Sequence, residues 1–195
     1  MKKQIVVASN NAHKLQEIAE IFTEYEIISQ RQAGFSEDVE ETGTTFVENA
    51  LIKARAVCQA LGCITLADDS GLCVVALDGK PGVYSARYAG EHGNDKQNRA
   101  LLLQNMQGKT DRRAYFTCAL ALVTPDGKEI TVEGKTYGEI LTEEIGTGGF
   151  GYDCIFKNED LGKSFGLATA EEKNSVSHRS RALQSLKASC DGILD

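Results

Sequence analysis

The stretch ITLADDSG, residues 64–71, decides how the rest of the chain is interpreted. Its apolar start, residues 64–66, predicts a short buried strand, and two adjacent carboxylates follow where that strand is expected to end. Neighbouring carboxylates repel each other, and burying either one without a partner is costly. A bound divalent cation would remove that cost, because hard cations take carboxylate oxygens as ligands. A solvated turn explains the same residues equally well, since Asp, Ser and Gly are common in turns.

The segments before this strand predict an α/β start. Residues 5–8 form an apolar run typical of a buried strand, and residues 15–22 carry apolar side chains at helical spacing. Thr45 and Glu48 form a capping box, which predicts a second helix that ends at Gly62. A strand, two helices and a further strand in this order favour parallel pairing of the two strands.

The second half of the chain predicts further strands and helices. Residues 95–106 have a helical pattern, and residues 114–122 alternate at period two before a turn and a partner strand over residues 129–135. A glycine-rich loop covers residues 147–151, and a last helix is expected over about residues 177–190. The fold class is therefore α/β with a mixed sheet, in one continuous domain or in two lobes that share a long strand.

Composition limits the class of function. The 195 residues carry a formal net charge of −7, which argues against a DNA-wrapping or membrane-surface protein but not against a nucleotide substrate. The six cysteines form no C-x-x-C pair, and no signal-like segment precedes the first strand, so reduced thiols in a cytoplasmic protein are expected. No apolar run approaches the ~20 residues of a membrane-spanning helix.

The loop after the first predicted strand is a candidate anion site. Free backbone N–H groups at the start of the following helix bind anions. Lys14 opposes the dipole of that helix, which a bound phosphate would explain. An ordinary capped helix with His13 at the surface is the alternative, because the P-loop pattern is absent. The loop residues are Ser9, Asn10, Asn11, Ala12, His13 and Lys14.

An acidic stretch and a lysine form a candidate metal and phosphate site. Glu40 or Glu41 is a candidate to share a metal ion with Asp69, and Lys53 on the helix that follows is a candidate for phosphate binding. A solvated acidic loop and a surface lysine are the ordinary alternatives. Ser70 is better explained as a ligand or cap than as a nucleophile, since no G-x-S-x-G elbow and no zinc spacing occur.

Two further segments suggest recognition of a nucleotide. In the glycine-rich loop, Phe150 and Tyr152 are candidates to stack on a base, and Asp153 to accept a hydrogen bond. A flexible hairpin loop plugged by aromatic side chains is the alternative. His178 and Arg179 begin the last helix, downstream of Lys173, where a polar ligand or a loose surface cluster of basic residues explains them about equally well.

Taken together, these motifs resemble the Ham1-like (RdgB-type) inosine triphosphate pyrophosphatase family, bacterial branch, over nearly the full chain. The segments that carry the resemblance are residues 9–14 with Glu17, residues 40–45 with 48–50, and residues 67–72, 81–88, 147–153 and 177–179. Two positions depart from the family pattern. Asn10 stands where glycine is usual, and Cys154 stands where proline is usual.

The resemblance implies a fold and an activity. The fold is an elongated mixed β-sheet with two lobes, flanked by helices around a central nucleotide cleft, in a single domain over residues 1–195. The activity is Mg²⁺-dependent hydrolysis of ITP, dITP and XTP to the monophosphate and pyrophosphate. A cytoplasmic homodimer is expected, with no nucleic-acid or membrane partner. A silent purine-binding module, a phosphomonoesterase and a glycosidase with paired carboxylates are the competing interpretations.

The resemblance also implies roles for individual residues. Asp69 is the expected general base and metal ligand, Glu40 the second metal ligand, and Glu41 and Asp68 lie nearby. The expected phosphate-binding residues are Ser9, Asn10, Asn11, Ala12, His13, Lys14 and Lys53. The expected nucleoside-binding residues are Ser70, Phe150, Gly151, Tyr152, Asp153, Lys173, His178 and Arg179.

Overall fold

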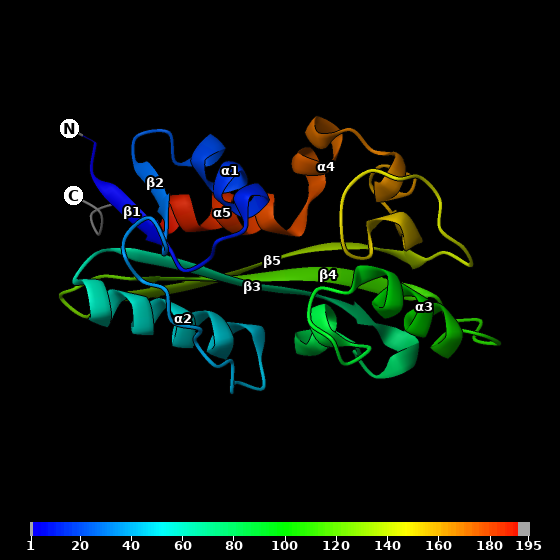
Figure 1. Cartoon of the computed structure of the whole chain (residues 1–195). Helices are drawn as coiled ribbons and strands as arrows, with labels where there is room; N and C mark the ends of the chain where they lie inside the picture. Colours follow the sequence, from blue (N-terminus) through cyan, green and yellow to red (C-terminus); the bar gives the residue numbers. More distant parts are fainter. Residues whose placement is uncertain (1, 191–195) are drawn as a thin grey trace. The chain divides into compact units, whose positions relative to one another are not determined.

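The computed structural model describes residues 2–190, which form a mixed α/β fold (Figure 1). Its sheet has six strands in the order β2-β1-β3-β4-β5-β6. β1 pairs in parallel with both β2 and β3, whereas β5 and β6 are antiparallel, so the predicted mixed sheet and parallel pairing are confirmed. The strands are β1 (Gln4–Val7), β2 (Glu26–Ser29), β3 (Thr65–Val74), β4 (Arg113–Val123), β5 (Glu129–Ile140) and β6 (Phe156–Asn158).

The predicted helices are confirmed, and their ends follow local capping rules. The capping box of Thr45 and Glu48 begins α2, and Gly62 ends it in the left-handed conformation with φ +63°. The short elements β2 and β6 were not predicted, because a few residues carry too little periodic pattern. α4 was not predicted as a helix either, although Thr169 and Glu172 form the capping box that begins it. The helices are α1 (Ala12–Ile21), α2 (Phe46–Leu61), α3 (Asp95–Asn105), α4 (Ala170–Val176) and α5 (His178–Ser189). Short 3₁₀ turns are η1 (Val75–Leu77), η2 (Gly82–Arg87), η3 (Asp153–Ile155) and η4 (Phe165–Leu167).

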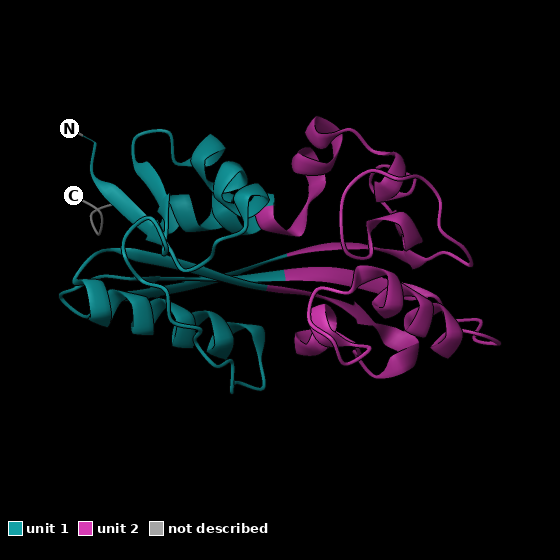
Figure 2. Cartoon of the chain, viewed as in Figure 1, with its two compact units in different colours: residues 1–69, 118–134, 180–195 teal, residues 70–117, 135–179 magenta. Residues whose placement is uncertain are grey.

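The chain divides into two compact units (Figure 2). Unit 1 comprises residues 1–69, 118–134 and 180–195, and unit 2 comprises residues 70–117 and 135–179. β3, β4 and β5 each contribute residues to both units. That these lobes form a single domain around a nucleotide cleft stays a prediction.

In unit 1, alternate strand residues supply two apolar clusters, one on each face of the sheet. α1 and α5 cover one face and α2 covers the other (Figure 1). The first cluster joins Ile5 and Leu66 to Ile18 of α1 and Leu183 of α5. The second joins strand residues such as Ala67 to the apolar side of α2. Both faces of these strands are therefore buried.

Unit 2 has its own core, built largely from aromatic side chains. The rings of Phe116 and Phe156 meet edge to face with centroids 4.7 Å apart, and Phe165 packs against both. Leu102 of α3 and Met106, the C-cap residue of that helix, close this cluster. Five of the six cysteines are buried and Cys63 is half-buried. Within residues 2–190, none of the helices combines the length and apolarity that crossing a membrane requires.

The structure differs from the sequence-based prediction at the acidic pair. β3 does not end at Leu66 but continues to Val74, so the solvated-turn alternative is wrong. Asp68 and Asp69 lie in the middle of the strand and are only 2% and 8% exposed. Successive side chains of a strand point to opposite faces, so the two carboxylates are presented to different helices.

Candidate functional site

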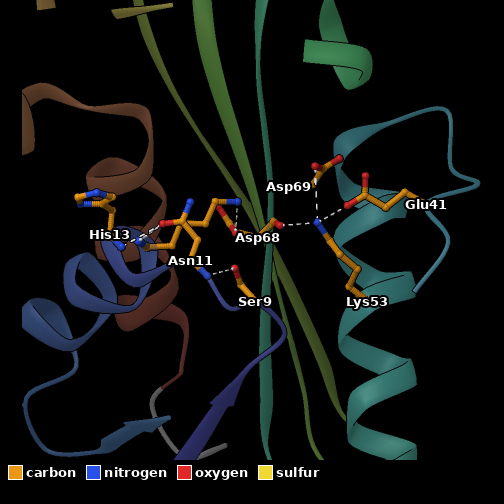
Figure 3. Close-up of polar contacts among 8 residues, drawn as sticks. Ser9, Asn11, His13, Glu41, Lys53, Asp68 and Asp69 are labelled. Carbon is orange, nitrogen blue, oxygen red and sulfur yellow. Dashed lines mark hydrogen bonds and ion pairs between the residues drawn. The ribbon is translucent and has the colours of Figure 1, made fainter. Parts of the chain in front are cut away.

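Two lysines from two helices hold the acidic pair in unit 1 (Figure 3). The Nζ atom of Lys14, on α1, lies 2.8 Å from Oδ1 of Asp68. On α2, Nζ of Lys53 donates to the carbonyl oxygen of Asp68 at 2.7 Å and lies 3.6 Å from Oδ1 of Asp69. Glu41 also contacts Lys53, with Oε1 at 2.7 Å. Five charged groups thus meet around two residues of one strand.

The loop before α1 is arranged as the sequence predicted for a helix start. The side chain of Asn11 caps α1 by accepting from the backbone N–H groups of His13 at 3.0 Å and Lys14 at 3.3 Å. Ser9 Oγ accepts from the backbone of Asn11, and Asn10 Oδ1 accepts from the backbone of Arg31. The dipole disfavours a cation in the first turn, but Asp68 offsets that effect at Lys14. Ala12 and His13 are exposed.

Sequence reasoning missed Asn49 as a site residue. It is fully buried on α2, and its Nδ2 donates to Oδ2 of Asp69 at 3.1 Å. Its Oδ1 accepts from the backbone N–H of Gly43 at 2.8 Å. A Cβ at Gly43 would come within 2.6 Å of that oxygen, so the loop requires glycine here. An asparagine beside Ala50 on the apolar side of the helix was the available signal.

The charges of this cluster do not balance equally at its two aspartates. Burial raises the pKa of Asp69, and Glu41 and Asp68 raise it further, whereas Lys53 and the hydrogen bond from Asn49 oppose the shift. Burial opposes the charged form of Lys53, but its carboxylate neighbours outweigh that effect and raise its pKa. The charged form of Lys53 is stabilised by several carboxylates at once, whereas Asp69 must share this lysine with them. Asp69 is therefore undercompensated: the groups around it do not offset the cost of burying its charge.

The described residues contain no group of three or more His, Cys, Asp or Glu side chains that could hold a metal ion. Within these residues, the four acidic side chains considered from the sequence (Glu40, Glu41, Asp68 and Asp69) therefore do not converge on one metal site. Glu41 reaches the cluster by contacting Lys53, whereas Glu40 is exposed. Two carboxylates converging on one ammonium still provide hard oxygen donors, and Mg²⁺ is commonly held by one or two carboxylates plus phosphates and water. The donor set thus fits Mg²⁺ bound together with a phosphorylated ligand.

Unit 2 contains a second polar cluster, at the glycine-rich loop. Oδ2 of Asp153 lies 2.6 Å from Nζ of Lys173 and accepts from the backbone N–H of Phe150 at 2.8 Å. The Lys173 ammonium also lies 4.4 Å from the centroid of the Phe150 ring, which is a cation–π distance. At Gly149 a Cβ would clash with the Asp153 carboxylate. The loop is thus folded around one buried ion pair.

The structure separates the two aromatic residues that the sequence treated alike. Phe150 is 42% exposed, whereas Tyr152 is buried and donates its hydroxyl to the carbonyl oxygen of Ser85 at 2.7 Å. Phe150 is therefore the accessible ring of this loop, which is not a hairpin plugged by both rings. Cys154 is buried within η3, where burial raises the pKa of its thiol.

The basic residues at the start of α5 are buried, so the alternative of a loose surface cluster is wrong. His178 stacks on Phe116 with centroids 5.1 Å apart, and both His178 and Arg179 belong to unit 2. Lys173 is buried as well, and Ser70 is half-buried in β3. The structure brings Phe150, Asp153 and Lys173 into direct contact.

Comparison with known proteins decides the family. The sequence matches the Ham1 family over residues 5–189. The chain belongs to the Ham1 family. Proteins named dITP/XTP pyrophosphatase from Clostridium perfringens and Nitrosomonas europaea are each 47% identical to this chain. The first alignment covers 98% of this chain and 99% of the relative, and the second covers 94% and 92%.

Solved structures of Ham1 proteins have the same fold. The Staphylococcus aureus Ham1 protein superposes with a TM-score of 0.91 at 43% identity, covering 98% of this chain and 100% of that one. A Mycobacterium abscessus protein, described as a nucleoside-triphosphatase / dITP/XTP pyrophosphatase, superposes with a TM-score of 0.80 at 45% identity. This match covers 94% of this chain and 98% of that one. The family resemblance and the mixed α/β fold are thereby confirmed.

In this Ham1 chain, Lys14 should be required for stability because it neutralises Asp68. Lys14→Met leaves a buried carboxylate without its ion pair, which should lower the free energy of unfolding by about 3 kcal/mol in urea titrations. The double variant Lys14→Met/Asp68→Leu should recover most of that loss, because both charges are removed. Lys128→Met is the control, since its exposed ion pair with Asp126 is screened by water and its loss should leave the free energy of unfolding nearly unchanged. A Lys14→Met protein as stable as the wild type would contradict this account.

The raised pKa of Asp69 predicts how stability depends on pH in the metal-free protein. The folded state binds this proton more tightly than the unfolded state, so the unfolding free energy falls as pH rises from the ordinary aspartate pKa through the raised value. Asp69→Asn mimics the protonated side chain, so this variant should match the wild type in acid and exceed it near neutrality. Urea unfolding in EDTA across the pH range measures the difference. A variant less stable than the wild type near neutrality would show that Asp69 is not undercompensated.

Proposed function

We propose that this chain hydrolyses deaminated purine nucleoside triphosphates such as dITP, XTP and ITP to the monophosphate and pyrophosphate. Relatives that align over nearly their whole length carry the name dITP/XTP pyrophosphatase. The observation that carries the proposal is the cluster of Asp69, Glu41, Lys14 and Lys53, because it combines carboxylates for water and metal with lysines for phosphate. A homodimer, implied by the resemblance, remains part of the proposal.

Asp69 is the proposed general base. Attack at phosphorus requires an oriented water whose proton is taken up during the reaction. A raised pKa makes Asp69 a stronger base than an ordinary aspartate, and Asn49 fixes one of its oxygens at 3.1 Å. The other oxygen, Oδ1, faces Lys53 at 3.6 Å, which is longer than a hydrogen bond. That oxygen is the one we assign to the attacking water.

Glu41 and Asp69 are the residues that we propose would hold Mg²⁺, with Glu41 preferred to Glu40 because Glu41 contacts Lys53. When bound, the ion supplies charge neutralisation on the phosphate oxygens. Lys14 and Lys53 then bind phosphate through the ammonium groups that contact the carboxylates in the free protein. Loop 9–14 is assigned to the same anion on the family resemblance, with the N–H groups of His13 and Lys14 already capped by Asn11.

The groups of unit 2 are proposed to recognise the nucleoside. Phe150 offers an exposed ring for stacking on the purine, while Asp153 and Lys173 supply an acceptor and a donor. His178 and Arg179 are assigned to the 6-oxo edge of the base on the family resemblance. Selectivity against ATP and GTP then comes from the amino groups of their purine rings. Where such an amino group replaces a hydrogen or an oxygen of the deaminated base, polar groups of the site lose their hydrogen-bond partners.

Product analysis tests the proposal directly. The protein is incubated with dITP, XTP or dGTP, each with Mg²⁺ or with EDTA, and the products are separated. We expect monophosphate and pyrophosphate from dITP and XTP only with Mg²⁺, and little turnover of dGTP. Orthophosphate and diphosphate as products would point to a phosphatase. Binding of dITP without turnover would point to a purine-binding module.

Asp69→Asn should abolish most turnover without harming the fold. Loss of a general base lowers kcat by about a thousandfold, while the melting temperature should not fall. Asp38→Asn, which alters an exposed acidic residue, is the matched control and should keep wild-type kcat. Steady-state release of pyrophosphate measures both variants. Wild-type kcat in Asp69→Asn would remove this residue from the base role.

A further inference from the structure

We propose that Asp95 and Arg99 of α3 are positioning residues that hold the glycine-rich loop so that Phe150 presents its ring to the purine. This inference rests on the proposed function. Neither residue stands out in the sequence, and neither carries a group that we assign to the reaction or to the base. Their importance follows from what they bind in unit 2.

Both residues bind the backbone of Gly151. The N–H of Gly151 donates to Oδ2 of Asp95 at 2.9 Å, and Nη1 of Arg99 donates to the carbonyl oxygen of Gly151 at 2.8 Å. The two side chains are four residues apart, so they project from the same side of α3. Nε of Arg99 also donates to Oε1 of Glu144 at 2.7 Å, which orients the guanidinium.

The preceding peptide is held by a different carboxylate. The N–H of Phe150 donates to Oδ2 of Asp153, whose other partner is Lys173. Two consecutive N–H groups of the loop are therefore bound by two carboxylates from different elements. Gly151 adopts φ +59°, a conformation in which residues other than glycine are strained. The direction of the chain between Phe150 and Tyr152 is thus fixed by both contacts and backbone conformation.

This turn decides which aromatic side chain is accessible. Tyr152 points into the core and donates to Ser85 of η2, while Phe150 stays exposed beside the Lys173 ammonium. The same helix also binds η2, because the side chain of Asn98 bonds the backbone of Ala86 and of Ala89. α3, η2 and the loop are therefore one hydrogen-bonded assembly, with Phe150 at its exposed position.

Kinetics with matched variants test the inference. If the contacts of Asp95 and Arg99 with Gly151, here called the clamp, present Phe150 to the base, then Arg99→Met and Asp95→Ala should each raise KM for dITP about tenfold. This is the size expected for a lost stacking contact, and kcat should change less than twofold. Asp95→Asn retains an acceptor for the Gly151 N–H and should restore most of the affinity. Arg113→Met, which breaks an exposed pair with Asp111, is the control and should leave KM unchanged.

A double-mutant cycle separates positioning from general destabilisation. Arg99→Met should add little to the KM of Phe150→Ala, because both changes remove the same stacking contact, whereas independent effects would multiply. Multiplying effects, or a loss of kcat equal to the rise in KM, would overturn the inference.

Hydrogen exchange provides a readout that does not depend on activity. Peptides covering residues 147–153 should exchange faster in Arg99→Met and in Asp95→Ala than in wild type or Arg113→Met, at unchanged melting temperature. Unchanged hydrogen exchange of residues 147–153 in both variants would overturn the inference that Asp95 and Arg99 hold the loop, whatever the kinetic results are. Failure of the wild type to hydrolyse dITP would instead overturn the proposed function, and the exchange result would still decide whether Asp95 and Arg99 hold the loop.

Discussion

Two adjacent carboxylates inside a buried strand must be compensated from both faces of the sheet, and the structure of unit 1 depends on this constraint. Because strand side chains alternate, the side chains of Asp68 and Asp69 point to opposite faces, and no single helix can pair with both carboxylates. α1 brings Lys14 to the first, and α2 brings Asn49 and Lys53 to the second. The two helices that pack on opposite faces are therefore required for charge balance as well as for the apolar core.

The two carboxylates are not compensated equally, and the difference suggests a structural role for Asp68 and a functional role for Asp69. Asp68 has a close ion pair, and its carbonyl oxygen anchors Lys53. Asp69 shares that lysine with Glu41 at a longer distance, and burial raises its pKa. A carboxylate held at a cost in stability is available to a metal ion or a water proton. In unit 2, the Asp153–Lys173 pair has a comparable role for the loop that carries Phe150, since it fixes a backbone beside an exposed ring.

Much of the fold could be predicted because it is encoded locally. The capping box that begins α2 and the alternation in β4 are patterns within a few residues. The course of β3 could not be predicted, because the residue types Asp-Asp-Ser-Gly are typical of a turn. The ion-pair partner of Asp68, Lys14, lies 54 residues away in the sequence. The odd position of Lys14 in the first turn of a helix was the one local sign of that contact. Asn49, Asp95 and Arg99 were missed for a similar reason, since their partners are distant in sequence.

The most direct test is a carbon-13 NMR titration of the aspartate carboxyl groups in the metal-free protein, with Asp69→Asn used to assign the Asp69 signal. The account predicts that Asp69 titrates at a higher pH than an ordinary aspartate and that its signal moves when Mg²⁺ and IMP are added together. Titration of Asp69 at or below the ordinary aspartate pKa would contradict the account. So would an Asp69 signal that does not respond to Mg²⁺ and nucleotide, because the undercompensated carboxylate would then have no part in binding.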